Sequence, residues 1–165
     1  MPHAVKPQPP KPVIVIDSRE QREWQFSDAV ETVRGTLHTG DYSLQGHEST
    51  VTLERKSLAD LVGSVIQDRE RFSRELERMA SFAFRAVLIE SDLSAVRDHL
   101  YLSKAHPSAV FGSVCCLHAD YNVPFIWCHD RPIAARVAER LLRRLHERFE
   151  EKPLDSDGAS LSPTP

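Results

Sequence analysis

The sequence lacks the features that mark membrane-spanning and secreted proteins. It has no uninterrupted apolar run of about 18 residues, the length that crosses a bilayer. Its first twelve residues carry proline, lysine and histidine but no apolar stretch typical of a secretory signal. Three cysteines, Cys115, Cys116 and Cys128, are too few and too close for a disulfide framework. We therefore expect buried, reduced thiols and a cytoplasmic protein, nucleoid-associated in a prokaryote or nuclear in a eukaryote.

An excess of positive charge is also missing. The chain has 21 lysines and arginines against 24 acids, a formal net charge of −3. A protein that binds nucleic acid through bulk positive charge would have the opposite balance. With 41% hydrophobic residues among 165, the composition predicts one globular domain. Composition also predicts a flexible, proline-rich N-terminus over 1–12, a folded domain over 13–150 and a disordered tail over 151–165.

What the sequence does have is an alternation of buried strands and amphipathic helices. Residues 13–16 are apolar on both faces, which predicts an interior strand of a sheet. Pro124 favours an edge position for the last strand. Apolar residues recur every four positions from Ile133 to Phe149 and predict the inward face of the last helix. The pattern predicts an α/β fold with a mixed sheet. The expected strands are 13–16, 33–39, 42–45, 50–56, 86–89 and 123–128. One helix is expected to begin near 58, and the others are expected at 69–84, 91–100, 107–121 and 131–149.

Charged side chains gather where the predicted strands end. The hairpin turn expected at 46–49 places Asp41 directly opposite Glu54, with Cβ atoms about 4.5–5.5 Å apart. Glu54 and Lys56 are two positions apart on one strand, so their side chains project from the same face. The hairpin therefore predicts that Asp41, Glu54 and Lys56 converge on one patch.

These residue types suit metal-dependent phosphodiester chemistry. Two carboxylates that close repel each other unless a proton or a cation lies between them. Their hard oxygen atoms are ligands for Mg²⁺ or Mn²⁺, and a lysine beside them orients a water or stabilises a charged transition state. The alternatives are solvated charges at strand ends and a hydrolase of small phosphorylated molecules. The absence of a glycine-rich phosphate loop argues against such a hydrolase.

Three motifs in order along the chain resemble those of the ERCC4-type nuclease domain, the family of the XPF and MUS81 endonucleases. They are residues 13–20 (VIVIDSRE), 39–42 (TGDY) and 53–61 (LERKSLADL). The resemblance implies a restriction-endonuclease-like mixed β-sheet flanked by α-helices, and metal-dependent DNA cleavage. It implies that Mg²⁺ or Mn²⁺ is held by Asp17, Asp41 and Glu54. Glu20, Arg55 and Lys56 would complete the catalytic residues, joined by Asp60, whereas Arg19 is an alternative structural partner of a carboxylate.

The resemblance extends to a basic helix after the third motif, which implies DNA contacts from Arg69 and Arg71. Arg140, Arg143 and Arg144 on the last helix are a second candidate DNA-binding face, with a solvated helix face as the alternative. Trp24 and Phe26 are expected to pack near the first strand rather than to stack on a base.

Family members usually carry a helix–hairpin–helix module after the nuclease domain, and the residues after 150 are too few for one. We therefore expect DNA as a partner, together with a second copy of the chain or a DNA-binding subunit, and no membrane. A scaffold subunit without catalysis is the alternative to an endonuclease.

Overall fold

The computed structural model describes residues 10–151. The predicted flexible segment therefore lies outside the described residues except for 10–12, as does the predicted tail beyond Glu151. Six strands form one sheet in the order β2-β1-β3-β4-β5-β6. The elements in chain order are β1 (Val13–Asp17), β2 (Glu31–Gly35), β3 (Tyr42–Leu44), β4 (Val51–Lys56), α1 (Leu58–Ile66), α2 (Arg69–Ala80), β5 (Phe84–Ile89), α3 (Leu93–Arg97), α4 (Pro107–Tyr121), β6 (Phe125–Trp127) and α5 (Arg131–Glu151).

The sheet is mixed, as the sequence predicts. β3 is antiparallel to both β1 and β4, whereas β2 is parallel to β1, and β4, β5 and β6 are parallel to one another. β1 lies inside the sheet and β6 at its edge, which confirms both expectations. Edge position suits Pro124 beside β6, because a proline has no N–H for a ladder bond.

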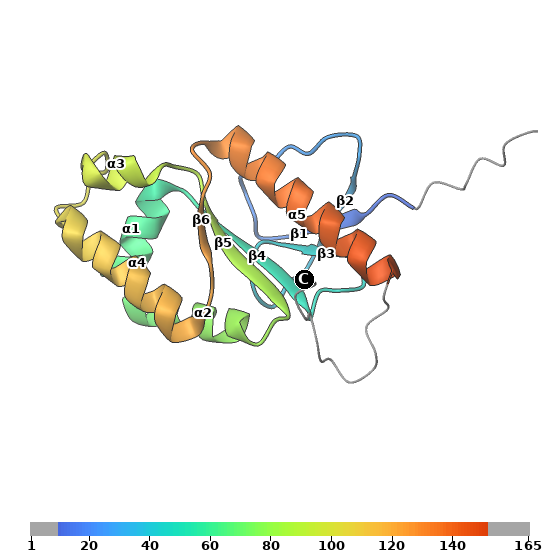
Figure 1. Cartoon of the computed structure of the whole chain (residues 1–165), viewed down its shortest axis with the longest axis horizontal. Helices are drawn as coiled ribbons and strands as arrows, with labels where there is room; N and C mark the ends of the chain where they lie inside the picture. The colour runs from blue at the N-terminus through green and yellow to red at the C-terminus, as the bar shows by residue number, and fades with distance from the viewer. Residues whose placement is uncertain (1–9, 152–165) are drawn as a thin grey trace, which may run out of the picture.

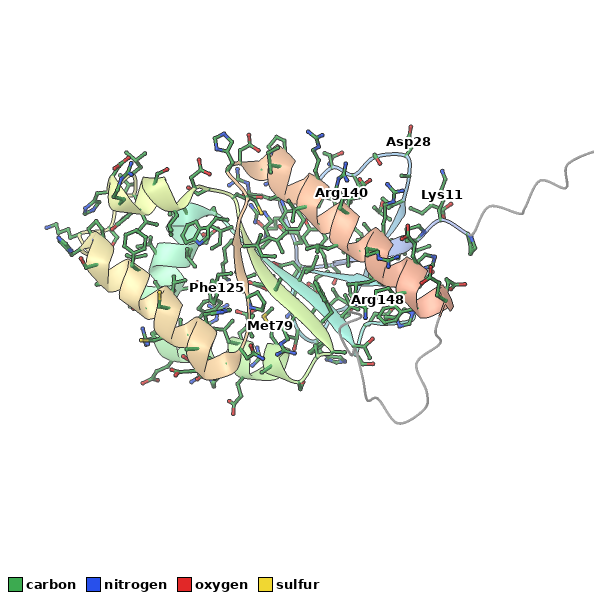
Figure 2. The ribbon with its side chains drawn as sticks, in the orientation of Figure 1. Lys11, Asp28, Met79, Phe125, Arg140 and Arg148 are labelled. Carbon is green, nitrogen blue, oxygen red and sulfur yellow. The ribbon has the colours of Figure 1, made fainter. Side chains whose placement is uncertain are left out.

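The sheet lies between two layers of helices (Figure 1). α5 covers one face and packs against β3 and β5, burying a core that includes Ile14, Leu53 and Leu142. The other helices cover the opposite face, where α1, α2 and α4 contact one another. Met79 and Phe125 belong to this second core (Figure 2). Because both faces are covered, residues on either side of β1, β3, β4 and β5 are mostly buried, whereas β2 is exposed, and polar residues of these inner strands lie in a low-dielectric setting.

Several helix ends follow the predicted signals. Ser57 caps α1, with its hydroxyl accepting from the Asp60 N–H. Pro107 occupies the first turn of α4, and Asp130 accepts from the Ile133 N–H at 2.8 Å to cap α5. Within the described residues, no helix is both long enough and apolar enough to cross a bilayer.

The strand expected at 33–39 is displaced to Glu31–Gly35. After Gly35 the main chain leaves the sheet, because the Leu37 N–H donates to Asp17 and the Leu37 carbonyl accepts from Arg19. α2 ends at Ala80 rather than 84, since Phe84 already pairs in β5. α3 also stops early, at Arg97, and its N-cap is Asp92 rather than Ser91.

The inward face of α5 matches the prediction at Leu145 and Phe149 but differs at the start of the helix. Ile133 is 36% exposed, whereas Ala134, Ala138 and Leu142 are fully buried. Alanines face the sheet because their small side chains let the helix backbone approach it closely. The cysteine expectation is also partly wrong. Cys128 is buried, but Cys115 and Cys116 are exposed on α4.

Candidate active site

Main-chain pairing brings the three predicted motifs together. Tyr42 pairs with Leu53, which confirms the predicted hairpin register and sets Asp41 opposite Glu54. The Asp17 N–H donates to the Asp41 carbonyl at 2.8 Å, and the Asp41 N–H donates to the Leu53 carbonyl at 2.8 Å. The carboxylates therefore lie on neighbouring strand ends because of sheet register.

Gly40 makes this close approach possible. Its φ is +76°, in the left-handed region, and a Cβ added to it would lie 2.1 Å from Thr52 Oγ1 and 2.9 Å from the Leu53 carbonyl oxygen. Only glycine fits such a position without strain. The backbone conformation of the site therefore requires glycine at the position before Asp41.

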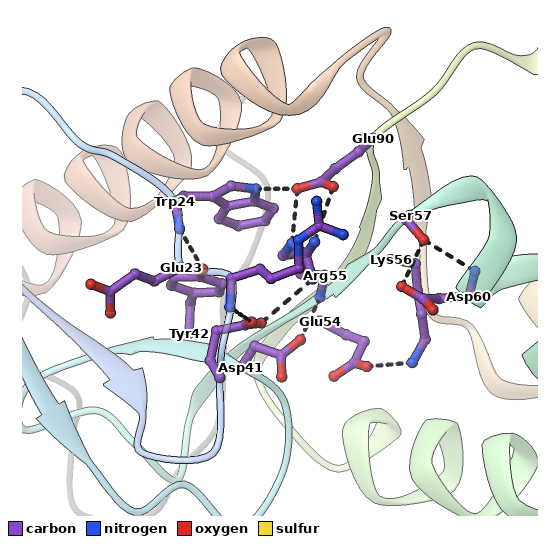
Figure 3. A network of polar contacts seen from close by, with 12 residues as sticks. Glu23, Trp24, Asp41, Tyr42, Glu54, Arg55, Lys56, Ser57, Asp60 and Glu90 are labelled. Atoms are coloured by element: carbon purple, nitrogen blue, oxygen red, sulfur yellow. Dashed lines mark hydrogen bonds and ion pairs between the residues drawn. The ribbon is translucent and has the colours of Figure 1, made fainter.

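Asp41, Glu54 and Lys56 form the centre of the site (Figure 3). Lys56 Nζ donates to Glu54 Oε1 at 2.6 Å, so the two side chains share a face as predicted. Burial raises the pKa of Asp41 to about 6. Burial also raises the pKa of Glu54, and the charge of Asp41 raises it further. Burial opposes the charge of Lys56, but Glu54 and Glu75 outweigh it and raise the lysine pKa. The pair of carboxylates is therefore electrostatically strained unless a positive charge lies between them.

Asp17 is held by its own loop. One of its oxygens accepts from Arg19 Nε at 2.8 Å, and the other accepts from the Leu37 N–H at 2.8 Å. Burial works against the Asp17 charge, but these hydrogen bonds outweigh it and lower the pKa. Arg19 is thus the structural partner that the sequence offered as an alternative.

Arg55 points away from the carboxylate pair. Its side chain is 7% exposed and its Nε donates to Glu90 Oε1 at 2.8 Å. Its Nη1 lies 3.7 Å from Glu20 Oε2. Trp24 Nε1 donates to the same Glu90 oxygen at 2.8 Å (Figure 3). Trp24 is also stacked on Tyr42, with ring centroids 4.4 Å apart, so its predicted packing role is confirmed.

The first residue of α5 secures the loop after β1. Arg131 Nη2 donates to the carbonyls of Arg22 and Glu23. Its buried Nη1 has no hydrogen-bond partner among the described residues and lies 3.7 Å from Glu90 Oε1. Glu90 is thus approached by positive or donor groups from three separate segments.

A cleft of about 480 Å³ opens over the carboxylates, and we call it the site cleft. Arg19 and Arg22 line it from the loop after β1, and Arg71 and Arg78 line it from α2. Arg69, by contrast, is not among the lining residues. Asp60 also stays outside the site cleft, because its carboxylate accepts from the Ser57 hydroxyl at the start of α1.

The predicted arginines of the last helix lie elsewhere. Arg140, Arg143 and Arg144 line a separate hollow of about 610 Å³ between α5 and the loop at 25–27. Arg143 Nη1 lies 3.8 Å from Glu139 and Arg144 Nη1 lies 3.2 Å from Glu147. None of the three borders the site cleft.

Comparison with known families agrees with the geometry. The model of the ERCC4 domain matches residues 16–141, most of the chain. The chain belongs to the ERCC4 domain family. The resemblance carried by the three motifs is therefore confirmed.

Two solved structures share the fold of this ERCC4 domain. XPF from Aeropyrum pernix matches with a TM-score of 0.65 and 21% identity, over 85% of this chain and 68% of that chain. XPF from Aeropyrum pernix in complex with DNA matches with a TM-score of 0.63 and 19% identity, over 88% of this chain and 68% of that one. The predicted restriction-endonuclease-like fold is confirmed. No curated protein matches the chain.

The donor set of this ERCC4 domain fits a hard divalent cation. Mg²⁺ usually takes one or two carboxylates and keeps several waters, which is what Asp41 and Glu54 offer. A cation there would offset the repulsion that raises the pKa of Glu54. In the described part of the chain, no three His, Cys, Asp or Glu side chains group closely enough to form a complete metal site. Both oxygens of Asp17 already accept hydrogen bonds, from Arg19 and from the Leu37 N–H.

Sequence reasoning missed two acids of the ERCC4 domain. Glu90 follows a buried strand, the same signal that marked Asp17, and it holds Arg55 and Trp24. Glu75 lines the site cleft from α2, where its Oε2 lies 3.9 Å from Lys56 Nζ. Glu75 belongs to the helix that resembles the family's basic helix, but its sequence position gave no role in the site, because only the packing of α2 brings it to the strand.

Proposed function

We propose that this chain is a metal-dependent endonuclease that hydrolyses DNA phosphodiester bonds with Mg²⁺ or Mn²⁺. The observation that carries the proposal is the pair of half-buried Asp41 and buried Glu54 beside Lys56, in a cleft bordered by arginines. Membership of the ERCC4 domain family and the likeness to a DNA-bound XPF support DNA as the substrate. Branched or flap-like DNA, as met in repair and recombination, is the substrate we propose.

Each side chain has a place in the proposed reaction. Asp41 and Glu54 hold the cation, which would supply an activated water and charge stabilisation at the scissile phosphate. Lys56 presents an ammonium to the developing negative charge. Asp17 keeps the loop after β1 in place through Arg19 and serves as a third ligand once freed.

The remaining groups act on the substrate backbone or on the site's shape. Arg71 and Arg78 lie across the site cleft from the loop arginines, so a phosphate backbone would run between the two sets. Arg55 and Glu20 hold each other and stiffen the cleft wall rather than contact the reacting phosphate.

The test compares wild type with Asp41→Asn and with Asp28→Asn, a control on an exposed loop. Plain duplex, flap, fork and single-stranded DNA are incubated with each protein in Mg²⁺, in Mn²⁺ and in chelator. We expect cation-dependent cleavage by wild type and Asp28→Asn, and a loss of at least a hundredfold in Asp41→Asn. Equal cleavage by all three would reject the site.

Binding without cleavage of any substrate would instead favour a scaffold subunit. Sedimentation of the same protein with and without DNA measures whether it acts as a homodimer, which we propose as one of two arrangements. The other is a heterodimer in which a DNA-binding subunit supplies the second half.

A further inference from the structure

Lys56 lies among three groups that each favour its positive charge. Its Nζ is 2.6 Å from Glu54 Oε1 and 3.9 Å from Glu75 Oε2. The same Nζ is 5.0 Å from the centroid of the Phe72 ring, a cation–π distance. Glu54, two positions earlier on β4, is the nearer acid, and both other groups come from α2.

The single carboxylate of Glu54 has to balance two positive charges. In the structure it neutralises the Lys56 ammonium, and under the proposed function it also neutralises a divalent cation. A cation and an ammonium a few ångströms apart repel each other, and the repulsion is stronger in a buried site than in water. Glu54 is almost completely buried, with 5% of its surface exposed, so solvent provides little screening.

Glu75 is placed to resolve this conflict. It is the second carboxylate at the ammonium, and it is fixed to a well-packed helix, since Phe72, Leu76 and Met79 of α2 are buried. The lysine stem is flexible and its three donors are equivalent, so a shift of its Nζ toward Glu75 needs no movement of the strand. Phe72 lies under the ammonium and offers its ring face.

We propose that Glu75 is a positioning residue that takes over the Lys56 ammonium when a divalent cation occupies Glu54. This inference rests on the proposed function, because it assumes that Asp41 and Glu54 hold the cation. Lys56 then stays charged and at the site cleft while Glu54 acts as a ligand. Without Glu75 the ammonium stays paired with Glu54 and competes with the cation.

The test is a double-mutant cycle on cation binding, measured by calorimetric titration of Mn²⁺ into the whole chain without nucleic acid. The four proteins are wild type, Glu75→Gln, Lys56→Met and the double variant. We expect Glu75→Gln to weaken Mn²⁺ binding roughly threefold to tenfold while Lys56 is present, and less than about twofold in the Lys56→Met background. Glu77→Gln removes an exposed charge of the same helix and controls for net charge.

The same weakening by Glu75→Gln in both backgrounds would overturn the proposal, because Glu75 would then act on the cation directly. No effect in either background would also overturn it. The Asp41→Asn variant separates this failure from failure of the proposed function. If wild type binds Mn²⁺ no better than Asp41→Asn does, then Asp41 and Glu54 do not form a cation site. Circular dichroism verifies each fold, and Glu75→Ala replaces the glutamine variant if that one unfolds.

A kinetic readout separates positioning from general stabilisation. In Mn²⁺ at saturating concentration, Glu75→Gln should lower kcat for the best DNA substrate and leave KM for DNA unchanged. Glu77→Gln should leave both unchanged. A rise in KM alone would assign Glu75 to substrate binding and contradict the proposal.

Discussion

The main-chain N–H of Arg55 donates to a carboxylate oxygen of Asp41 at 2.8 Å, while the Arg55 side chain turns to the opposite side of the strand. Successive strand residues alternate between faces, so one residue serves the carboxylate through its backbone and Glu90 through its guanidinium. Substitution of the Arg55 side chain therefore leaves the donor to Asp41 in place. Arg55 therefore contacts both the Asp41 carboxylate and the buried Glu90 network.

Glu90→Gln is expected to destabilise the domain by about 2–4 kcal/mol, because it removes a negative charge that compensates the buried Arg55 guanidinium. The same change leaves the Arg131 guanidinium with less compensating negative charge. Chemical denaturation measures the free energy of unfolding. Glu77→Gln, the same change at an exposed acid on α2, is the control. A loss below about 0.5 kcal/mol for Glu90→Gln would show that the network is not supporting the fold.

Gly40→Ala is expected to cost about 2–4 kcal/mol and to abolish cleavage, because its Cβ would collide with Thr52 and with the Leu53 carbonyl. Gly46→Ala is the matched control. Gly46 also has a positive φ, +82°, but nothing lies within 4 Å of an added Cβ, so it should cost only about 1 kcal/mol. Equal losses in the two variants would assign the whole effect to backbone conformation and none to crowding.

The contribution of Asp41 to stability in chelator should fall as pH rises from about 4 to about 6. The pKa of Asp41 is raised to about 6 by burial, so over this range the folded protein binds a proton that the unfolded chain has already released. The free energy of unfolding then decreases with pH, by about 1–3 kcal/mol for this group. The raised pKa of Glu54 acts in the same direction.

Asp41→Asn removes the titrating group and should flatten that pH dependence, leaving a more stable protein at pH 7 in chelator. Thermal melts across the pH range measure both effects. A steeper dependence in the variant would contradict the assigned direction.

The two sets of arginines should differ in what they control. Arg71→Ala with Arg78→Ala should reduce both DNA binding and cleavage, because both residues line the site cleft. Arg140, Arg143 and Arg144 changed together to alanine should weaken DNA binding and lower its salt dependence, by roughly one unit of slope for each phosphate that is no longer neutralised. Since these three lie in a separate hollow, cleavage at saturating DNA should persist. Unchanged DNA binding in the triple variant would show that these three arginines form only a solvated helix face.

The sequence predicted the centre of the site because the relevant contacts are local. A hairpin turn fixes the pairing of its strands, so the positions of Asp41, Glu54 and Lys56 followed from counting residues. The interior position of β1 likewise followed from apolar residues on both its faces.

Contacts that depend on packing between distant segments were not predictable in this way. Trp24 and Glu90 are 66 positions apart, and only the folded sheet brings the indole N–H to the carboxylate. The end of β2 depends on how Asp17 captures the Leu37 N–H. On α5, apolar periodicity favoured Ile133, but close approach to the sheet selected the alanines instead.

The hold of Arg131 on the carbonyls of Arg22 and Glu23 has a consequence for the order of events during synthesis. The two carbonyls lie 109 and 108 positions earlier in the chain than the arginine that binds them. A nascent chain can therefore pair β1, β3 and β4 long before the loop between β1 and β2 is also held from α5. Arg34 of β2 holds the same loop at the Glu20 carbonyl, so a chain interrupted before the start of α5 has the acidic pair and this first hold but lacks the second one, at Arg22 and Glu23.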